Sequence, residues 1–216
     1  MTARAASRPV RAVLFDLDGV LIDSYEAWFV VVNEAARELK AKAVSRELFH
    51  SIFGQGIAAD LKNLYPGRTR EEVEPAYVRS MARQTASIHV NPEALAVLAS
   101  LRTRGIARAC VTNTQEGLAR AILSASRLAD GFDVVQGVRA GVREKPAPDL
   151  LLAALEALAV LPEDALMVGD SRYDEAAAAA AHVPFLHYDL KHDGSLGAAL
   201  DVGLAARTGA GHDRPS

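Results

Sequence analysis

The sequence has one cysteine, no long apolar run and little net charge, and each shortage excludes a class of protein. Cys110 is the single cysteine, so no disulfide can form within the chain, and its apolar neighbours predict a buried, inert thiol. No apolar run approaches the roughly 20 residues that cross a bilayer, and the run after the basic N-terminus is too short for a secretion signal. The net charge of −3 offers nucleic acid no broad basic field. We therefore expect a cytoplasmic protein without nucleic-acid or membrane partners.

The composition is that of a folded globular protein. Half of the 216 residues are hydrophobic and 24% are charged, which excludes a disordered chain. This length allows one main hydrophobic core and a smaller second one.

Short apolar runs alternate with helical patterns along most of the chain, and this alternation favours an α/β fold with a Rossmann-like parallel sheet. The predicted strands are 12–15, 107–112, 132–135, 165–168 and 184–187. The predicted helices are 92–104, 115–126, 149–159 and 172–181.

The stretch between the first two strands has a different pattern. Residues 25–88 contain no convincing strand and read as several helices, with Ser24 as a plausible N-cap for the first. An ordinary strand-helix-strand crossover would need fewer residues. We predict a core of residues 1–23 and 89–202, a helical insert of residues 24–88, and a mobile tail of residues 203–216 that is rich in Gly, Ala and Arg.

Polar residues gather where predicted strands end. In open α/β sheets these positions face a common crevice, so we expect carboxylates, a hydroxyl and a lysine to converge there. Three neighbouring carboxylates would repel one another unless a cation neutralised them, and oxygen ligands select Mg²⁺. A lysine and a hydroxyl beside that ion would suit a phosphoryl group. The residues are Asp16, Asp18, Thr112, Asn113, Lys145 and Asp170.

The segments that hold these residues resemble the ordered motifs of the haloacid dehalogenase superfamily. The four segments are DLDGVLIDS, VTNT, REKPAPD and VGDSRYDEAAAAAA. The set is similar to that of the phosphatases whose helical cap is inserted after the first motif. GDSR with its following Asp, the VTN triplet and the FGQG turn in the insert most resemble phosphoglycolate phosphatases and their close relatives.

The resemblance implies a catalytic role for four residues. Asp16 would be the nucleophile that forms an aspartyl-phosphate. Asp18 would protonate the leaving alcohol and then deprotonate the attacking water. Residues two apart on extended backbone point the same way, so both carboxyls would reach one substrate. Thr112 and Lys145 would hold the phosphoryl oxygens.

The resemblance also implies a magnesium site and a set of substrate contacts. Asp16, the backbone carbonyl of Asp18, and Asp170 would hold Mg²⁺, with Asp174 acting behind them or through a water molecule. The substrate would be a small phosphorylated metabolite, and the protein a monomer or homodimer. The implied substrate-side residues are Gly19, Asn113, Gly54, Gln55, Gly56 and Arg172.

Other interpretations remain open. Asp-Gly dipeptides often form turns, Asp170 could cap a helix, and Asp174 could simply favour the helix dipole. The chain also departs from phosphoglycolate phosphatases, because Thr114 and Gln115 replace their usual Lys-Pro after VTN, and His182 stands where a glycine usually ends the following helix.

Two other functions also fit the same motifs. A sugar-phosphate mutase shares all four of them, and release of phosphate from a sugar bisphosphate would separate a phosphatase from it. An inactive module that binds a phosphorylated ligand would show tight binding without metal-dependent turnover. Dehalogenation does not call for a second carboxyl at the position of Asp18.

Overall fold

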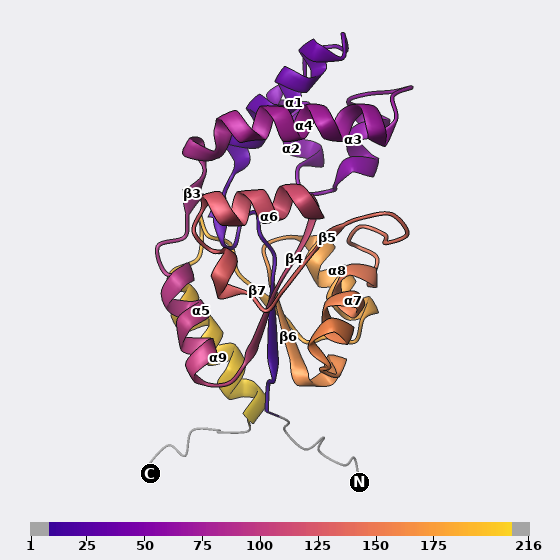
Figure 1. The fold of residues 1–216 in the computed structure, drawn as a ribbon. Coiled ribbons are helices and arrows are strands. Elements are labelled where there is room, and N and C mark those ends of the chain that lie inside the picture. Colours follow the sequence, from indigo (N-terminus) through magenta and orange to yellow (C-terminus); the bar gives the residue numbers. More distant parts are fainter. Residues whose placement is uncertain (1–8, 209–216) are drawn as a thin grey trace.

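The computed structural model describes residues 9–208, and its centre is a parallel sheet of five strands in the order β5-β4-β1-β6-β7. Figure 1 shows helices on both faces of this sheet and a helical layer beyond one end of it. The strands are β1 (Ala12–Phe15), β4 (Ala107–Gln115), β5 (Val134–Val138), β6 (Ala165–Gly169) and β7 (Phe185–His187). The α/β fold class predicted from the sequence is confirmed.

Strand β1 lies in the middle of the sheet and is buried on both faces, which explains its uninterrupted apolar sequence. Because side chains alternate along a strand, Val13 and Phe15 belong to one hydrophobic core and Ala12 and Leu14 to the other. The first core includes α5 (Ala94–Thr103), α6 (Glu116–Ala125) and α9 (Leu196–Thr208), and the second includes α7 (Asp149–Leu158) and α8 (Arg172–Ala180).

The predicted insert forms four helices above the carboxyl ends of the strands (Figure 1). Helices α1 and α4 pack together through buried residues such as Val31, Ala35, Ala76 and Met81. Two short antiparallel strands, β2 and β3, pair where the chain leaves the core and returns to it. The elements are α1 (Tyr25–Glu38), α2 (Arg46–Ile52), α3 (Ile57–Asn63), α4 (Arg70–Gln84), β2 (Ile22–Asp23) and β3 (His89–Val90).

Helix α9 was not predicted, and it covers the beginning of the segment 203–216 that was expected to be mobile. Residues 203–208 are helical, and residues 209–216 lie outside the described part of the chain. Leu196, Leu200 and Leu204 are buried in the first core. Their spacing of four residues places them on one face of a helix, and burial of this face outweighs the low helix propensity of the glycines in the segment.

Three short 3-10 turns complete the described chain, at Thr85–Ser87, Ala129–Gly131 and Pro162–Asp164. His182 follows α8 with a φ of +57°, so it adopts the left-handed conformation that a glycine would take without strain. Within residues 9–208, every helix is too short or too polar to cross a membrane.

Candidate active site

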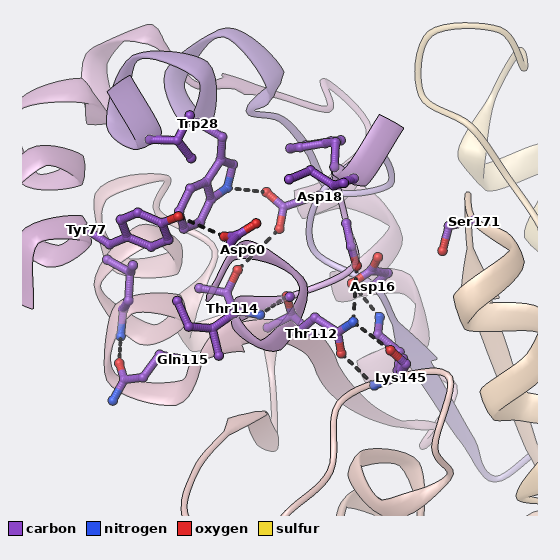
Figure 2. Close-up of a pocket in the computed structure, with 18 of the residues that line it drawn as sticks. Asp16, Asp18, Trp28, Asp60, Tyr77, Thr112, Thr114, Gln115, Lys145 and Ser171 are labelled. Carbon is purple, nitrogen blue, oxygen red and sulfur yellow. Dashed lines mark hydrogen bonds and ion pairs between the residues drawn. The ribbon is translucent and has the colours of Figure 1, made fainter. Parts of the chain in front are cut away.

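The site begins where β1 ends, at Asp16. The backbone N–H of Asp16 continues the sheet by donating to Val168 O at 2.9 Å. One carboxylate oxygen, Oδ1, accepts a hydrogen bond from the N–H of Leu17 at 2.8 Å and lies 2.8 Å from Nζ of Lys145. The carboxylate is therefore fixed by its own strand end and by a buried cation (Figure 2).

Lys145 is buried and carries the positive charge of the site. Its Nζ lies 2.8 Å from Asp16 and 2.5 Å from Asp174, and it donates to Val111 O at 3.0 Å. Burial lowers the pKa of Lys145, but the two carboxylates outweigh burial and hold the pKa above its ordinary value. The side chain therefore remains an ammonium.

Asn113 holds the backbone of Lys145. Its Oδ1 accepts from the N–H of Lys145 at 2.7 Å, and its Nδ2 donates to Lys145 O at 3.0 Å and to Gly54 O at 3.1 Å. Asn113 lies in an irregular part of β4, between Val111 and Gln115, where the pairing register with β5 shifts. Such a bulge redirects side chains, and here it allows one amide to link the core lysine to the helical insert.

Asp16 also belongs to a cluster of three carboxylates. One oxygen from each of Asp16, Asp170 and Asp174 lies within 4.8 Å of the others. Burial and the charge of Asp174 together raise the pKa of Asp170 to about 7, against the lowering effect of Lys145. Burial and Asp174 also raise the pKa of Asp16 well above its ordinary value, against the lowering effect of Lys145.

The charge of this cluster fits a divalent cation. Three carboxylates face a single ammonium, and a cation between the carboxylates would relieve their mutual repulsion. All of the candidate ligand atoms are hard oxygens, which suit Mg²⁺ better than a softer metal. Asp174 is also fixed by Ser171, whose N–H and Oγ both donate to its Oδ2 at the start of α8.

Gly19 permits Asp170 to approach the loop after β1. Its φ is +83°, and a Cβ at this position would lie 2.0 Å from Asp170 Oδ2. Both the backbone conformation and the close contact therefore require glycine. The sequence indicated a role for Gly19 on the substrate side, and in the structure it makes room for a carboxylate of the acidic cluster.

The side chain of Asp18 points away from the acidic cluster and toward the helical insert. Its Oδ1 accepts hydrogen bonds from Ser24 Oγ and, at 3.1 Å, from Trp28 Nε1, and Thr114 Oγ1 lies 3.5 Å from its Oδ2. Burial raises the pKa of Asp18, and the hydrogen bonds from Ser24 and Trp28 lower it in part. Asp18 is thus placed to hold a proton beside Asp16, on the side of the insert.

One sequence expectation changes with this arrangement. Ser24 occupies the N-cap position of α1, but its side chain makes no capping hydrogen bond and instead contacts Asp18. Trp28, one turn further along α1, donates its indole N–H to the same carboxylate.

A pocket lies between the sheet and the insert, with a cavity volume of about 110 Å³. Its floor contains Asp16, Thr112, Lys145 and Asp170 from the core. The Oγ1 of Thr112 accepts from the N–H of Thr114 at 3.1 Å, so the hydroxyl is oriented by its own strand. Figure 2 shows residues of the core and the insert around the same space.

Some of the predicted substrate residues line this pocket and others do not. Gly54 and Gly56 line it with left-handed backbone, at φ of +82° and +88°. Gln55 does not line the pocket, because its amide turns back to Ser51 O at 2.8 Å. Arg172 is exposed, does not line the pocket and stacks on Tyr173.

Other residues around the site were not among the candidates named from the sequence. Asp60 and Tyr77 line the pocket and hydrogen-bond to each other, from α3 and α4. Glu144 joins the core to the insert, since it accepts from the N–H of Ala58 at 3.2 Å and from Arg70 at 2.8 Å. A motif search finds none of these pairs, because their members are far apart in the sequence.

A parallel-sheet core with carboxylates and a lysine at the strand ends, closed by an inserted helical cap, defines a capped α/β hydrolase of the Rossmann-like type. The chain belongs to the haloacid dehalogenase-like hydrolases, and the sequence model of that family matches residues 13–188. Helices α1–α4 form the cap.

Named relatives support this family, and solved structures share the fold. The chain is 34% identical over 182 residues to the phosphoglycolate phosphatase of Nitrosospira multiformis, covering 80% of each protein. It is 32% identical to that of Aquifex aeolicus, covering 80% of this chain and 81% of that one. A structure of a putative phosphoglycolate phosphatase from Lactobacillus plantarum shares the fold with a TM-score of 0.73 at 24% identity, covering 91% of this chain and 99% of that one. CbbY from Rhodobacter sphaeroides, solved with phosphate, also has a TM-score of 0.73 at 24% identity, covering 87% and 91%.

Proposed function

We propose that the protein is a Mg²⁺-dependent phosphatase that hydrolyses a small phosphorylated metabolite through an aspartyl-phosphate, as phosphoglycolate phosphatases do. The observation that carries the proposal is the arrangement of Asp16. Its carboxylate lies at the floor of the pocket, against the ammonium of Lys145 and beside two further carboxylates. The 34% identity to named phosphoglycolate phosphatases supports the same reaction class.

In the first step, an oxygen of Asp16 forms a bond to phosphorus and the ester P–O bond breaks. Asp18 gives its proton to the departing alkoxide oxygen. Two features suit Asp18 to this role: its pKa is raised, and its carboxyl lies on the side of the pocket that faces the cap. In the second step a water molecule gives its proton to Asp18 and attacks phosphorus. The bond from Asp16 to phosphorus then breaks, and inorganic phosphate leaves.

Lys145 and Thr112 would stabilise the phosphoryl oxygens during both steps. The ammonium of Lys145 is buried, and a charge in such a place acts more strongly than one in water. Asp16, Asp170 and Asp174 would hold the magnesium ion with the carbonyl of Asp18, and the ion would neutralise phosphate charge. Asp174 contacts Lys145 directly, so it also fixes the lysine.

The cap would exclude bulk water from the reaction. The cavity of about 110 Å³ is smaller than the roughly 300 to 1,000 Å³ of drug-sized pockets. The enclosed space therefore favours a small metabolite. Opening of the cap about residues 24 and 88 would admit the substrate, as the motion of lids does in many enzymes.

The experiment is substitution of the nucleophile. Asp16→Asn should lower the turnover of para-nitrophenyl phosphate with Mg²⁺ by at least about a thousandfold, because an amide cannot form the acyl phosphate. The control is Asp130→Asn, an exposed acid outside the pocket, which should keep wild-type turnover. Wild-type turnover by Asp16→Asn would refute the proposal. In a second test the phosphate of the ester carries a radiolabel, and the absence of protein-bound label after acid quench of the wild type would also refute the proposal.

A further inference from the structure

The cap half of the pocket is aromatic and acidic. Trp28, Phe49, Phe53 and Tyr77 line it together with the carboxyl of Asp60. Glu74 also reaches the pocket and has a cation nearby, since Arg70 lies 3.4 Å from it and 2.8 Å from Glu144. Among the described residues that line the pocket, Lys145 on the floor is the only one with a cationic side chain. The part of the substrate beyond the phosphate therefore faces negative charge.

Asp60 has no cation of its own. Its Oδ2 accepts a hydrogen bond from the hydroxyl of Tyr77 at 2.8 Å, and within residues 9–208 no side chain forms an ion pair with it. Burial raises the pKa of Asp60, the hydrogen bond from Tyr77 opposes this and the charge of Glu144 adds to it, so that the pKa is about 7. Asp60 is half-buried and lines the pocket, and in the described part of the chain no cation balances it, so its carboxylate can serve as the counter-ion of a ligand there.

Aromatic rings surround this carboxyl and suit the same type of ligand. The rings of Trp28 and Tyr77 meet edge to face, with centroids 5.7 Å apart, and Figure 2 shows both beside Asp60 on the cap side of the pocket. Aromatic faces attract cations, and they attract them more strongly where water is excluded. A carboxyl with neighbouring aromatic rings is the chemistry that recognises an ammonium group.

We infer that the preferred substrate is the phosphate monoester of an alcohol that carries an ammonium group, with Asp60 as its counter-ion and Trp28 and Tyr77 around it. This inference rests on the proposed phosphatase and identifies its substrate class. The phosphate would lie over Asp16 and Lys145, and the ammonium would lie against the cap. A substrate with a carboxylate at that end, such as phosphoglycolate, would instead face Asp60 and Glu74 without a partner.

Three esters with a two-carbon skeleton test the inference. Phosphoethanolamine carries an ammonium, hydroxyethyl phosphate is neutral at that end, and phosphoglycolate carries a carboxylate. For the wild type with Mg²⁺, we expect kcat/KM to fall in this order, by about tenfold at each step. The reason is that a charge pair in a partly desolvated site changes binding by about one or two factors of ten. The ratio between esters within one variant cancels any loss of folded protein.

The variant that tests Asp60 is Asp60→Asn, which keeps its size and removes its charge. The preference for phosphoethanolamine over hydroxyethyl phosphate should fall from about tenfold to about one, and the disadvantage of phosphoglycolate should shrink. In the control Asp130→Asn, which changes the net charge equally, the ratios should stay as in the wild type. Tyr77→Phe should keep part of the preference, because the ring remains.

Several results would overturn the inference. One is a preference for phosphoglycolate in the wild type, and another is an ammonium preference that survives in Asp60→Asn. In either case, turnover of para-nitrophenyl phosphate would leave the phosphatase itself standing. If none of the phosphate esters were hydrolysed, the phosphatase proposal would fail, and the assignment of its substrate would fail with it.

Discussion

Replacement of Lys145 by methionine tests how the site is held together. Lys145 is 3% exposed, and its ammonium lies 2.8 Å from Asp16 and 2.5 Å from Asp174. At an effective dielectric constant of about 20, each ion pair at this separation is worth about 6 kcal/mol of Coulomb energy, and desolvation of the charges cancels several kcal/mol. Methionine fills much of the same volume, so the main effect is two buried carboxylates without their cation.

We expect Lys145→Met to lower the free energy of unfolding by about 3 to 5 kcal/mol near neutral pH without divalent metal. This is a large part of the 5 to 15 kcal/mol that typically holds a domain folded. Urea unfolding followed by far-UV circular dichroism measures the change. The control is Lys62→Met, which removes an exposed lysine from α3 and should change stability by less than about 0.5 kcal/mol.

The pH dependence of the same variant separates charge from packing. In Lys145→Met, Asp16 loses the cation that lowers its pKa, so the pKa of Asp16 should rise further and its protonation should relieve the repulsion as pH falls. The destabilisation should therefore be smaller at about pH 5 than at neutral pH. Equal stability of variant and wild type at neutral pH without metal would refute this account of the site.

Two further predictions concern the acidic cluster. Gly19→Ala should destabilise the protein, and weaken its stabilisation by Mg²⁺, more than Gly67→Ala does. Both glycines have a φ of +83°, but of the two only Gly19 lies so close to another group that a Cβ would clash, at 2.0 Å from Asp170 Oδ2. The pKa of Asp170 is about 7 in the folded protein, against an ordinary 3.8. Between these two pH values the folded protein binds a proton that the unfolded chain releases. Stability without metal should therefore fall as the pH rises from about 4 to about 7. Mg²⁺ should therefore raise the melting temperature more above pH 7 than near pH 4, and an equal shift at both pH values would contradict the raised pKa.

The elements of the core could be predicted because they follow local patterns. The predicted strand 12–15 coincides with β1, and the predicted helices agree with α5 to α8 to within a few residues. Strand β4 continues past residue 112, where the predicted strand ended. The prediction stopped too early because the last part of the strand consists of polar residues of the site. Helix α9 was missed because its glycines obscured the leucine spacing of its buried face.

The positions of the catalytic candidates could also be predicted, because parallel strands end at one edge of a sheet. Asp16, Lys145 and Asp170 lie far apart in the sequence and meet in the structure. Family resemblance indicated their roles, and the position of each after a strand indicated their convergence. The contacts of Asn113 with Lys145 and Gly54 could not be predicted, since they depend on how the cap lies on the core.

The sequence by itself determined the alternating strands and helices, the inserted cap and the acids at the ends of the strands, because each depends on neighbouring residues and their spacing. Only the tertiary structure decided that Asp18 turns toward Trp28, and that Asp60 and Tyr77 face the same pocket. Those contacts join helices of the cap to the core, and no periodic pattern encodes them. The proposed chemistry at the phosphate therefore depends on residues that local sequence identifies, whereas the proposed selection of the rest of the substrate depends on packing between distant segments.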